Sequence, residues 1–160
     1  DVCSSDLLLT CLHKLGEGLS AFTLPRLQVS TQGGFLALRP EGDASAIQSV
    51  ASACVTALHP LAEPLNEAEL ARRRRTPLTP EQDRLLVAWG YPWVMEHFQF
   101  HLSLTGPLEQ LTPDQRAAIV QLAQRHFEDL PPCRFEHLAL FTEPTAGADS
   151  VLTARVGLSA

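Results

Sequence analysis

The amino-acid sequence predicts an α+β fold with a mostly antiparallel sheet and flanking helices. Its patterning gives the order helix, two strands, helices, strand, helix and two strands, which is typical of this class. The first two strands are joined by a glycine-containing turn, and such a connection favours an antiparallel hairpin. Capping sequences mark three helix starts between the strands.

The N-terminal part of the sequence predicts a helix followed by a hairpin. Leu8–Leu19 is the expected helix, ending near Gly16 to Gly18. Phe22–Thr31 and Phe35–Arg39 are the expected strands. Gln32-Gly33-Gly34 joins them, because glycine supplies the positive φ that a tight turn needs.

The next helix is predicted from Asp43 onward. Asp43 can act as its N-cap, and Pro60 and Pro64 close it. Its apolar positions recur at helical spacing, in Ile47, Val50, Cys54 and Leu58.

Capping boxes predict the three remaining helices. They pair Asn66 with Glu69, Thr79 with Gln82, and Thr112 with Gln115. The last of these helices is expected to turn its apolar side inward, namely Ala118, Ile119, Leu122 and Phe127. Two strands should follow, Arg134–Phe141 and Val151–Leu158, around the turn-rich loop EPTAGADS.

Composition indicates a soluble cytoplasmic globule. With 160 residues, 45% of them hydrophobic, the chain is long enough for one domain with a core. No apolar run reaches the roughly 18 residues that a membrane span needs. A net charge of −6 argues against general nucleic-acid binding. Cys11, Cys54 and Cys133 have no metal-binding spacing, so we expect reduced, buried, inert thiols.

The segment FQFHLSLTGP, Phe98 to Pro107, is the strongest candidate for a functional site. Its apolar and polar residues alternate with the period-two pattern of a strand. His101 and Ser103 therefore point the same way, with Cα atoms about 6.6 Å apart. An imidazole and a hydroxyl at this spacing could contact one phosphate. A surface histidine without function is the competing interpretation of so short a pattern.

Three segments resemble a family of phosphonate-metabolism proteins in the 2H phosphoesterase superfamily. They are GGFLALRP (Gly33–Pro40), LNEAELARRR (Leu65–Arg74) and WGYPWVMEHFQFHLSLTG (Trp89–Gly106), in that order. The resemblance runs from about Leu8 to Gly157. It implies a two-lobed fold whose two H-x-T/S histidines act on a phosphate ester without a metal or cofactor.

Only the second of these motifs is found, in His101 and Ser103. No other histidine in the sequence is followed two residues later by serine or threonine. Asp1–Leu7 reads like a translated sequencing adaptor, so we expect a non-native start and an incomplete domain, residues 8–160, that lacks its N-terminal lobe segment. One imidazole contributes about 10²- to 10⁴-fold to such chemistry, so this chain alone is expected to be inactive.

Further candidate substrate-binding residues lie outside that motif. Thr105 adds a second hydroxyl. In the run Arg72 to Arg75, we expect Arg72 or Arg73 to hold phosphate, although a solvated helix end is the alternative. Tyr91 could stack on a nucleobase or ribose, although packing is the alternative. His97 and His101 lack a third ligand, so no metal is expected.

The resemblance implies a phosphodiesterase acting on a cyclic phosphodiester or a related phosphorylated ribose metabolite. In that mechanism one imidazole accepts a proton while the other donates one to the leaving oxygen. A non-catalytic module that binds phosphate or RNA ends is an alternative. An accessory protein of phosphonate degradation is another. The expected partner is a small phosphate ester. We expect binding neither to membranes nor to nucleic acids in general.

Overall fold

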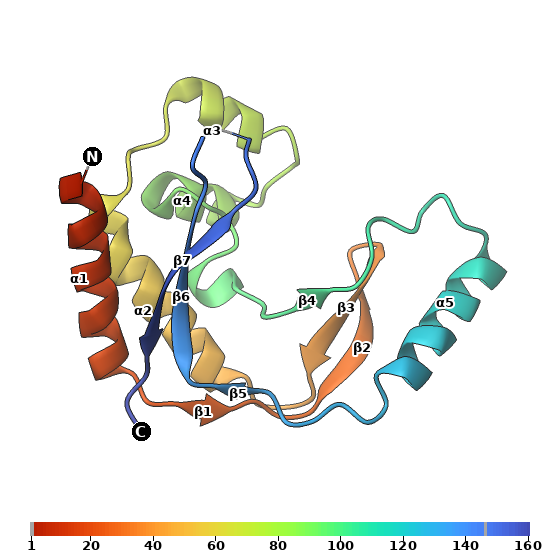
Figure 1. The fold of residues 1–160 in the computed structure, drawn as a ribbon. Coiled ribbons are helices and arrows are strands. Elements are labelled where there is room, and N and C mark those ends of the chain that lie inside the picture. Colours follow the sequence, from red (N-terminus) through yellow and green to blue (C-terminus); the bar gives the residue numbers. More distant parts are fainter. Residues whose placement is uncertain (1, 146) are drawn as a thin grey trace. The chain divides into compact units, whose positions relative to one another are not determined.

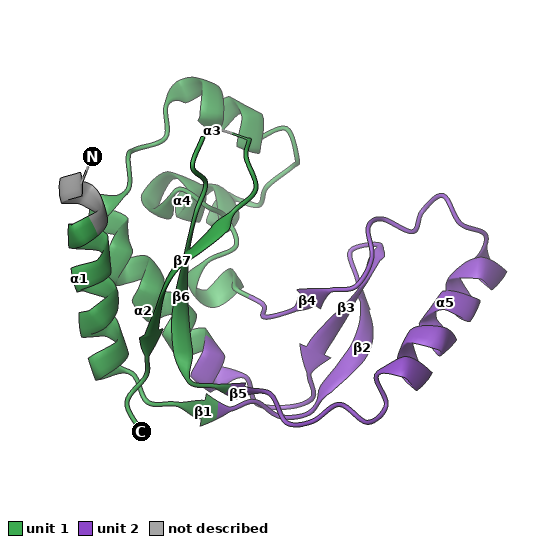
Figure 2. Cartoon of the chain, in the orientation of Figure 1, with its two compact units in different colours: residues 1–22, 48–98, 135–160 green, residues 23–47, 99–134 purple. Residues whose placement is uncertain are grey.

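A computed structural model describes residues 2–145 and 147–160 of the chain (Figure 1). Helices and antiparallel strand pairs alternate in it, which confirms the α+β class. The chain divides into two compact units, shown in Figure 2. Unit 1 comprises residues 1–22, 48–98 and 135–160, and unit 2 comprises residues 23–47 and 99–134.

Unit 1 contains most of the helical residues and one strand pair. Its helices are α1 (Val2–Gly18), most of α2 (Ser45–Leu58), α3 (Glu67–Arg73) and α4 (Pro80–Trp89), with short 3-10 turns at His59–Leu61 and Met95–His97. Strands β6 (His137–Thr142) and β7 (Val151–Gly157) are antiparallel, with an irregularity between Leu140 and Phe141. Helix α1 lies along β7 (Figure 1).

Close packing of α1 on β7 depends on a glycine. A Cβ atom on Gly16 would lie 2.5 Å from the carbonyl oxygen of Gly157 and 2.7 Å from Cγ1 of Val156. Only a residue without a side chain fits this approach without a shift of the backbone. Leu12 of α1 and Val156 of β7 are both buried in unit 1. The unit's most completely buried side chains are Leu85 and Leu86 of α4.

Unit 2 is built on a three-stranded antiparallel sheet in the order β2-β3-β4. Its strands are β2 (Leu27–Gln32), β3 (Phe35–Pro40) and β4 (Leu102–Ser103), and helix α5 (Pro113–His126) follows. The central strand β3 is buried on both faces, because Leu36, Ala37 and Leu38 are 0%, 0% and 5% exposed.

The predicted hairpin between β2 and β3 is confirmed, with a tighter turn than expected. Gln32 pairs with Phe35, so only two glycines form the turn. Gly33 and Gly34 both have positive φ, 52° and 88°. Two consecutive residues of this kind give the turn type whose twist matches that of the paired strands.

Two predicted strands are each divided. Phe22–Thr31 forms β1 (Phe22–Thr23) and β2, because Pro25 between them has no N–H to donate to a ladder. Arg134–Phe141 forms β5 (Arg134–Phe135) and β6, interrupted at Glu136. Strands β1 and β5 pair with each other, and the rings of Phe22 and Phe135 stack with centroids 5.1 Å apart.

The three predicted capping boxes are confirmed. In each, the side chain of the N-cap residue accepts the N3 backbone N–H and the N3 side chain accepts the N-cap N–H; the N-cap residues are Asn66, Thr79 and Thr112. Helix α4 ends at Gly90, which adopts a left-handed conformation with φ 78°.

The position predicted for the start of α2 is shifted. The helix begins at Ser45, so Asp43 precedes the N-cap position instead of occupying it. Its carboxylate accepts the Ser45 backbone N–H at 2.8 Å and the Ser45 hydroxyl at 2.9 Å. These hydrogen bonds, the backbone one above all, hold the pKa of Asp43 below its usual value. Asp43 therefore stabilises the turn that leads into the helix.

The prediction that α5 buries an apolar side is wrong. None of its side chains is buried, and Leu122 is 61% exposed. The helix instead borders a pocket of about 330 Å³, which Ile119, Leu122, Ala123, His126 and Phe127 line together with Leu36, Leu104 and Thr105. Because this space is not filled by protein atoms, the apolar face remains open to solvent.

The cysteines and the helices bear on two further expectations. Cys11, Cys54 and Cys133 are free thiols, as expected, but they are half-buried and not buried. Burial raises the pKa of the Cys54 thiol. Within the described residues, no helix combines the length and the apolar character that crossing a membrane requires.

Candidate functional site

The segment around His101 is less regular than the predicted strand. Of Phe98–Pro107, only Leu102 and Ser103 form β4, because regular pairing is limited to Leu38 and Ala37 of β3. Beyond β4 the chain stays beside β3 through a hydrogen bond from the Leu104 N–H to the Leu36 carbonyl, 2.8 Å long. The alternating pattern of this segment also predicts that its apolar residues are buried, and for Leu102 this prediction is wrong. It lies on an edge strand and is 44% exposed.

His101 and Ser103 lie on one face of the unit 2 sheet. Ser103 pairs with Ala37, and alternation along β3 places Phe35 and Arg39 on the same face as Ala37. The imidazole of His101 contacts the ring of Phe35, with centroids 5.7 Å apart. Ser103 is exposed and His101 is half-buried. Both side chains are thus partly accessible to a ligand.

One hydrogen bond selects the tautomer of the neutral His101 ring. Its Nδ1 lies 2.8 Å from the backbone carbonyl oxygen of Gln99. A carbonyl oxygen only accepts hydrogen bonds, so Nδ1 carries the proton and the neutral ring presents an unprotonated Nε2. This tautomer can take a proton from a nucleophile at Nε2, and the protonated ring can return one.

Gln99 links His101 to two residues that sequence reasoning missed. Its side-chain Oε1 accepts hydrogen bonds from Nε2 of Gln32 at 3.2 Å and from Nη2 of Arg39 at 3.5 Å. The polar alternation in β2 and β3 places Gln32 and Arg39 on one sheet face, but it does not identify the segment before β4 that joins them. That partner comes from 60 or more residues away in the sequence.

Thr105 is engaged with the backbone of β3. Its Oγ1 accepts a hydrogen bond from the Leu36 N–H at 3.0 Å, in a partly buried position. The same residue lines the pocket beside α5. A threonine hydroxyl still has a proton to donate when it accepts one bond, so this geometry leaves a contact with a ligand open.

The four arginines of the run Arg72 to Arg75 have different surroundings. Arg74 forms a two-point ion pair with Asp83 of α4. The guanidinium of Arg73 lies over the ring of Tyr91, with Cζ 5.9 Å from the ring centroid. Arg72 and Arg75 are exposed. The run is therefore neither a uniform solvated face nor a single binding surface.

Two of the predicted substrate-binding residues of unit 1 are in contact. Arg73 is half-buried, its Nε is buried without a hydrogen-bond partner, and Tyr91 is 48% exposed. Tyr91 is thus partly packed, against Arg73, and partly open to solvent. Arg72, Arg73 and Tyr91 belong to unit 1, whereas His101, Ser103 and Thr105 belong to unit 2.

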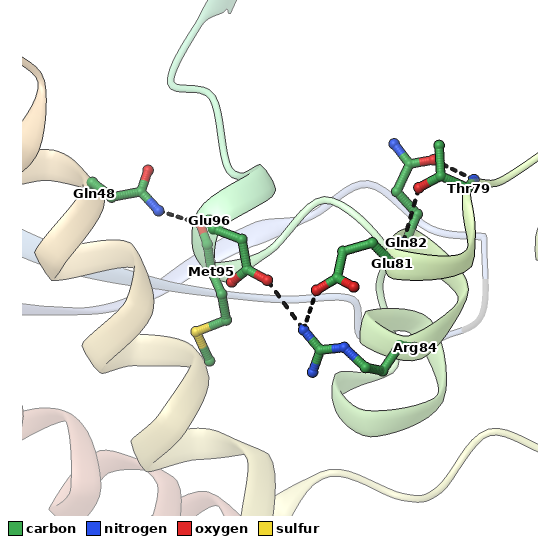
Figure 3. Close-up of polar contacts among 7 residues, drawn as sticks. All are labelled: Gln48, Thr79, Glu81, Gln82, Arg84, Met95 and Glu96. Atoms are coloured by element: carbon green, nitrogen blue, oxygen red, sulfur yellow. Dashed lines mark hydrogen bonds and ion pairs between the residues drawn. The ribbon is translucent and has the colours of Figure 1, made fainter.

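The chain that leads to His101 is anchored in unit 1 (Figure 3). Arg84 of α4 bridges Glu81 and Glu96, and the second contact measures 3.2 Å. Hydrogen bonding and charge from Arg84 lower the pKa of Glu81. Gln48 of α2 donates to the carbonyl of Met95. Met95 has φ 50°, which is unusual for a residue with a side chain. The hydrogen bond from Gln48 to its carbonyl and the ion pair of Glu96, the next residue, hold the backbone in this conformation.

A metal site would need several ligands in one place. Among the described residues, no group of three or more histidine, cysteine, aspartate or glutamate side chains could hold an ion. His97 contacts the ring of Trp93, with centroids 6.5 Å apart. The groups that unit 2 offers at the candidate site are the imidazole of His101, the hydroxyls of Ser103 and Thr105 and the guanidinium of Arg39.

The chain belongs to a family described as "Protein of unknown function (DUF1045)", whose model matches residues 1–150. It is also similar to two curated proteins named "Ribose 1,5-bisphosphate phosphokinase PhnN". The one from Janthinobacterium sp. (strain Marseille) is 35% identical over 142 residues, which cover 87% of this chain and 31% of that protein. The one from Laribacter hongkongensis (strain HLHK9) is 36% identical over 137 residues, covering 86% and 31%. The chain thus spans about a third of the length of these relatives. No solved structure matches it.

Proposed function

We propose that this chain is part of a metal-independent phosphoesterase of phosphonate metabolism. The observation that carries the proposal is the tautomer of His101, whose Nε2 is left to exchange protons on the sheet face that also carries Ser103. The resemblance to 2H phosphoesterases supports the reaction class. The name of the curated relatives refers to a ribose bisphosphate, which supports a phosphorylated ribose or its cyclic phosphodiester as the substrate class.

Each residue of the proposed site has a separate role. His101 accepts a proton from the attacking oxygen, or donates one to the leaving oxygen, through Nε2. Ser103 donates a hydrogen bond to a non-bridging phosphate oxygen as negative charge develops there. Thr105 binds a further oxygen of the substrate. Arg72, Arg73 and Tyr91 belong to unit 1, so their substrate-binding role stays a prediction from the sequence. A second imidazole is required for the opposite proton transfer.

Kinase chemistry is a weaker assignment for this segment. A P-loop phosphokinase holds nucleotide phosphates with the motif G-x-x-x-x-G-K-[ST]. The sequence contains one lysine, Lys14, which follows His13 and precedes Leu15, so that motif is not present here. The match covers 31% of each relative named as a phosphokinase. We therefore assign phosphate-ester chemistry to this segment.

A non-catalytic phosphate-binding module is the second candidate. It is favoured by one observation, the single H-x-T/S motif in the sequence. In that case His101 and Ser103 hold a phosphate without turning it over. Binding and turnover are measured separately to distinguish the two functions.

The test compares this chain with a longer version that supplies a second H-x-T/S histidine. Both are assayed against ribosyl cyclic phosphates and 2′,3′-cyclic nucleotides in the presence of EDTA. We expect turnover only in the longer version and its loss in His101→Ala, by about 10²-fold or more. His97→Ala is the matched control and should keep activity.

Activity that survives His101→Ala, or that EDTA abolishes, contradicts the enzyme proposal. Phosphate binding without turnover in the longer version supports the binding module.

A further inference from the structure

Arg39 is a cation on the same sheet face as the proposed catalytic histidine. It follows Ala37 by two residues on β3, and Ala37 pairs with Ser103. Its Nη2 lies 3.5 Å from Oε1 of Gln99, the residue whose carbonyl oxygen bonds the His101 ring. A guanidinium, a hydroxyl and an imidazole therefore gather on one face of unit 2.

The charge of Arg39 is not neutralised by the protein. Arg74 and Arg84 are each paired with carboxylates, at 2.6 Å from Asp83 and 3.2 Å from Glu96. Arg39 makes no ion pair within the part of the chain that the structure describes, and its contact with Gln99 is long and ends on a neutral oxygen. A half-buried guanidinium that lacks a carboxylate partner retains most of its hydrogen-bonding capacity.

We propose that Arg39 binds the phosphate group of the ligand at His101, so that unit 2 holds the anion with its own residues. This inference rests on the proposed function and adds a residue to its site. Arginine is suited to the role because its planar donors match two oxygens of a phosphate, and the bond is charge-assisted.

Gln99 acts as a positioning residue in this arrangement. Its backbone carbonyl orients the imidazole, and its side chain holds the guanidinium of Arg39 next to it. Replacing its side chain leaves the carbonyl in place. Gln99→Ala should therefore weaken phosphate binding through Arg39 while the Nδ1 proton of His101 keeps its acceptor.

Inorganic phosphate is the probe, titrated into the 160-residue chain at constant ionic strength. Binding is followed by the imidazole nitrogen resonances of His101 in two-dimensional NMR. We expect Arg39→Gln to raise the phosphate Kd on the order of tenfold or more, because a charge-assisted contact is lost. Arg116→Gln, on the exposed surface of α5, makes the same change in net charge and should alter the Kd less than about twofold.

The outcomes separate this inference from the proposed function. One outcome is that phosphate shifts the His101 resonances and Arg39→Gln binds phosphate as tightly as Arg116→Gln. Arg39 then has no role in binding, whereas the proposed phosphate site at His101 is retained. If phosphate leaves the wild-type His101 resonances unchanged, both proposals fail. Where Arg39→Gln does not fold, Arg39→Lys decides. Arg39→Lys keeps the positive charge but loses the planar pair of donors that a guanidinium presents to phosphate. An unchanged phosphate Kd in Arg39→Lys overturns the inference.

Discussion

Arg74 and Asp83 form a two-point ion pair, with Nε 2.6 Å from Oδ1 and Nη2 3.0 Å from Oδ2. The pair connects the C-terminal end of α3 to the first turn of α4. Hydrogen bonding to Arg74 lowers the pKa of Asp83, and the same bond raises the pKa of Arg74. One member of the arginine run is therefore committed to holding two helices of unit 1.

Asp83→Asn should lower stability at neutral pH and have progressively less effect in acid. Because the folded-state pKa of Asp83 is below its ordinary value of 3.8, its contribution is present above that value and is lost as pH falls through the folded pKa. Urea unfolding at pH 7 and near pH 3 measures the change. Asp114→Asn, also in the first turn of a helix, is the control and should show a smaller loss at pH 7. A difference between wild type and Asp83→Asn that grows on acidification would contradict the assignment.

Gly16→Ala should destabilise the protein, although alanine is normally the better helix former. The new Cβ would meet the Gly157 carbonyl oxygen and Val156 at 2.5 and 2.7 Å, so α1 must move away from β7. Overpacking of this kind costs about 1–3 kcal/mol in the free energy of unfolding. Gly18→Ala is the matched control, since its Cβ would meet nothing within 4 Å. Equal stability of the two variants in urea would show that the close approach is not needed.

Thr105→Val and Ser103→Ala should differ in their cost to stability, although both hydroxyls belong to the proposed site. The Thr105 hydroxyl accepts the Leu36 N–H in a partly buried position, so Thr105→Val should lower the free energy of unfolding by about 1–3 kcal/mol. Ser103 is exposed, so Ser103→Ala should change the free energy of unfolding by less than about 0.5 kcal/mol. In the phosphate titration, Ser103→Ala should show the larger loss of affinity. The reverse ranking would exclude a phosphate contact for Ser103.

The elements that could be predicted from the sequence are those whose signals are local. The capping boxes at Asn66, Thr79 and Thr112 each satisfy backbone donors within four residues, and all three form as expected. The turn at Gly33 and Gly34 has a local signal as well, because two adjacent glycines adopt positive φ without steric cost. Local hydrogen bonding and backbone preference favour these features, in agreement with the fold as a whole.

Features that depend on distant partners could not be predicted in full. Alternation along Phe98–Pro107 indicates a strand, but regular pairing extends only as far as β3 meets it, at Leu102 and Ser103. The apolar side of α5 has a helical period, yet whether Leu122 is covered depends on what packs against it. His101 and Ser103 were identified through a motif. Gln32, Arg39 and Gln99 belong to no motif and are brought together only by the folded sheet.

Neither unit is continuous in the sequence, and this sets the order in which the candidate site can assemble during synthesis. Arg39 leaves the ribosome 60 residues before Gln99, an interval of several seconds at roughly 5–20 residues per second. Until β4 emerges, the edge of β3 at Leu36, Ala37 and Leu38 has no partner on that side, and an unpaired strand edge can pair with another chain. Residues 48–98, which belong to unit 1, are made within this interval. The rate at which they are synthesised thus determines how long the nascent hairpin is open to aggregation.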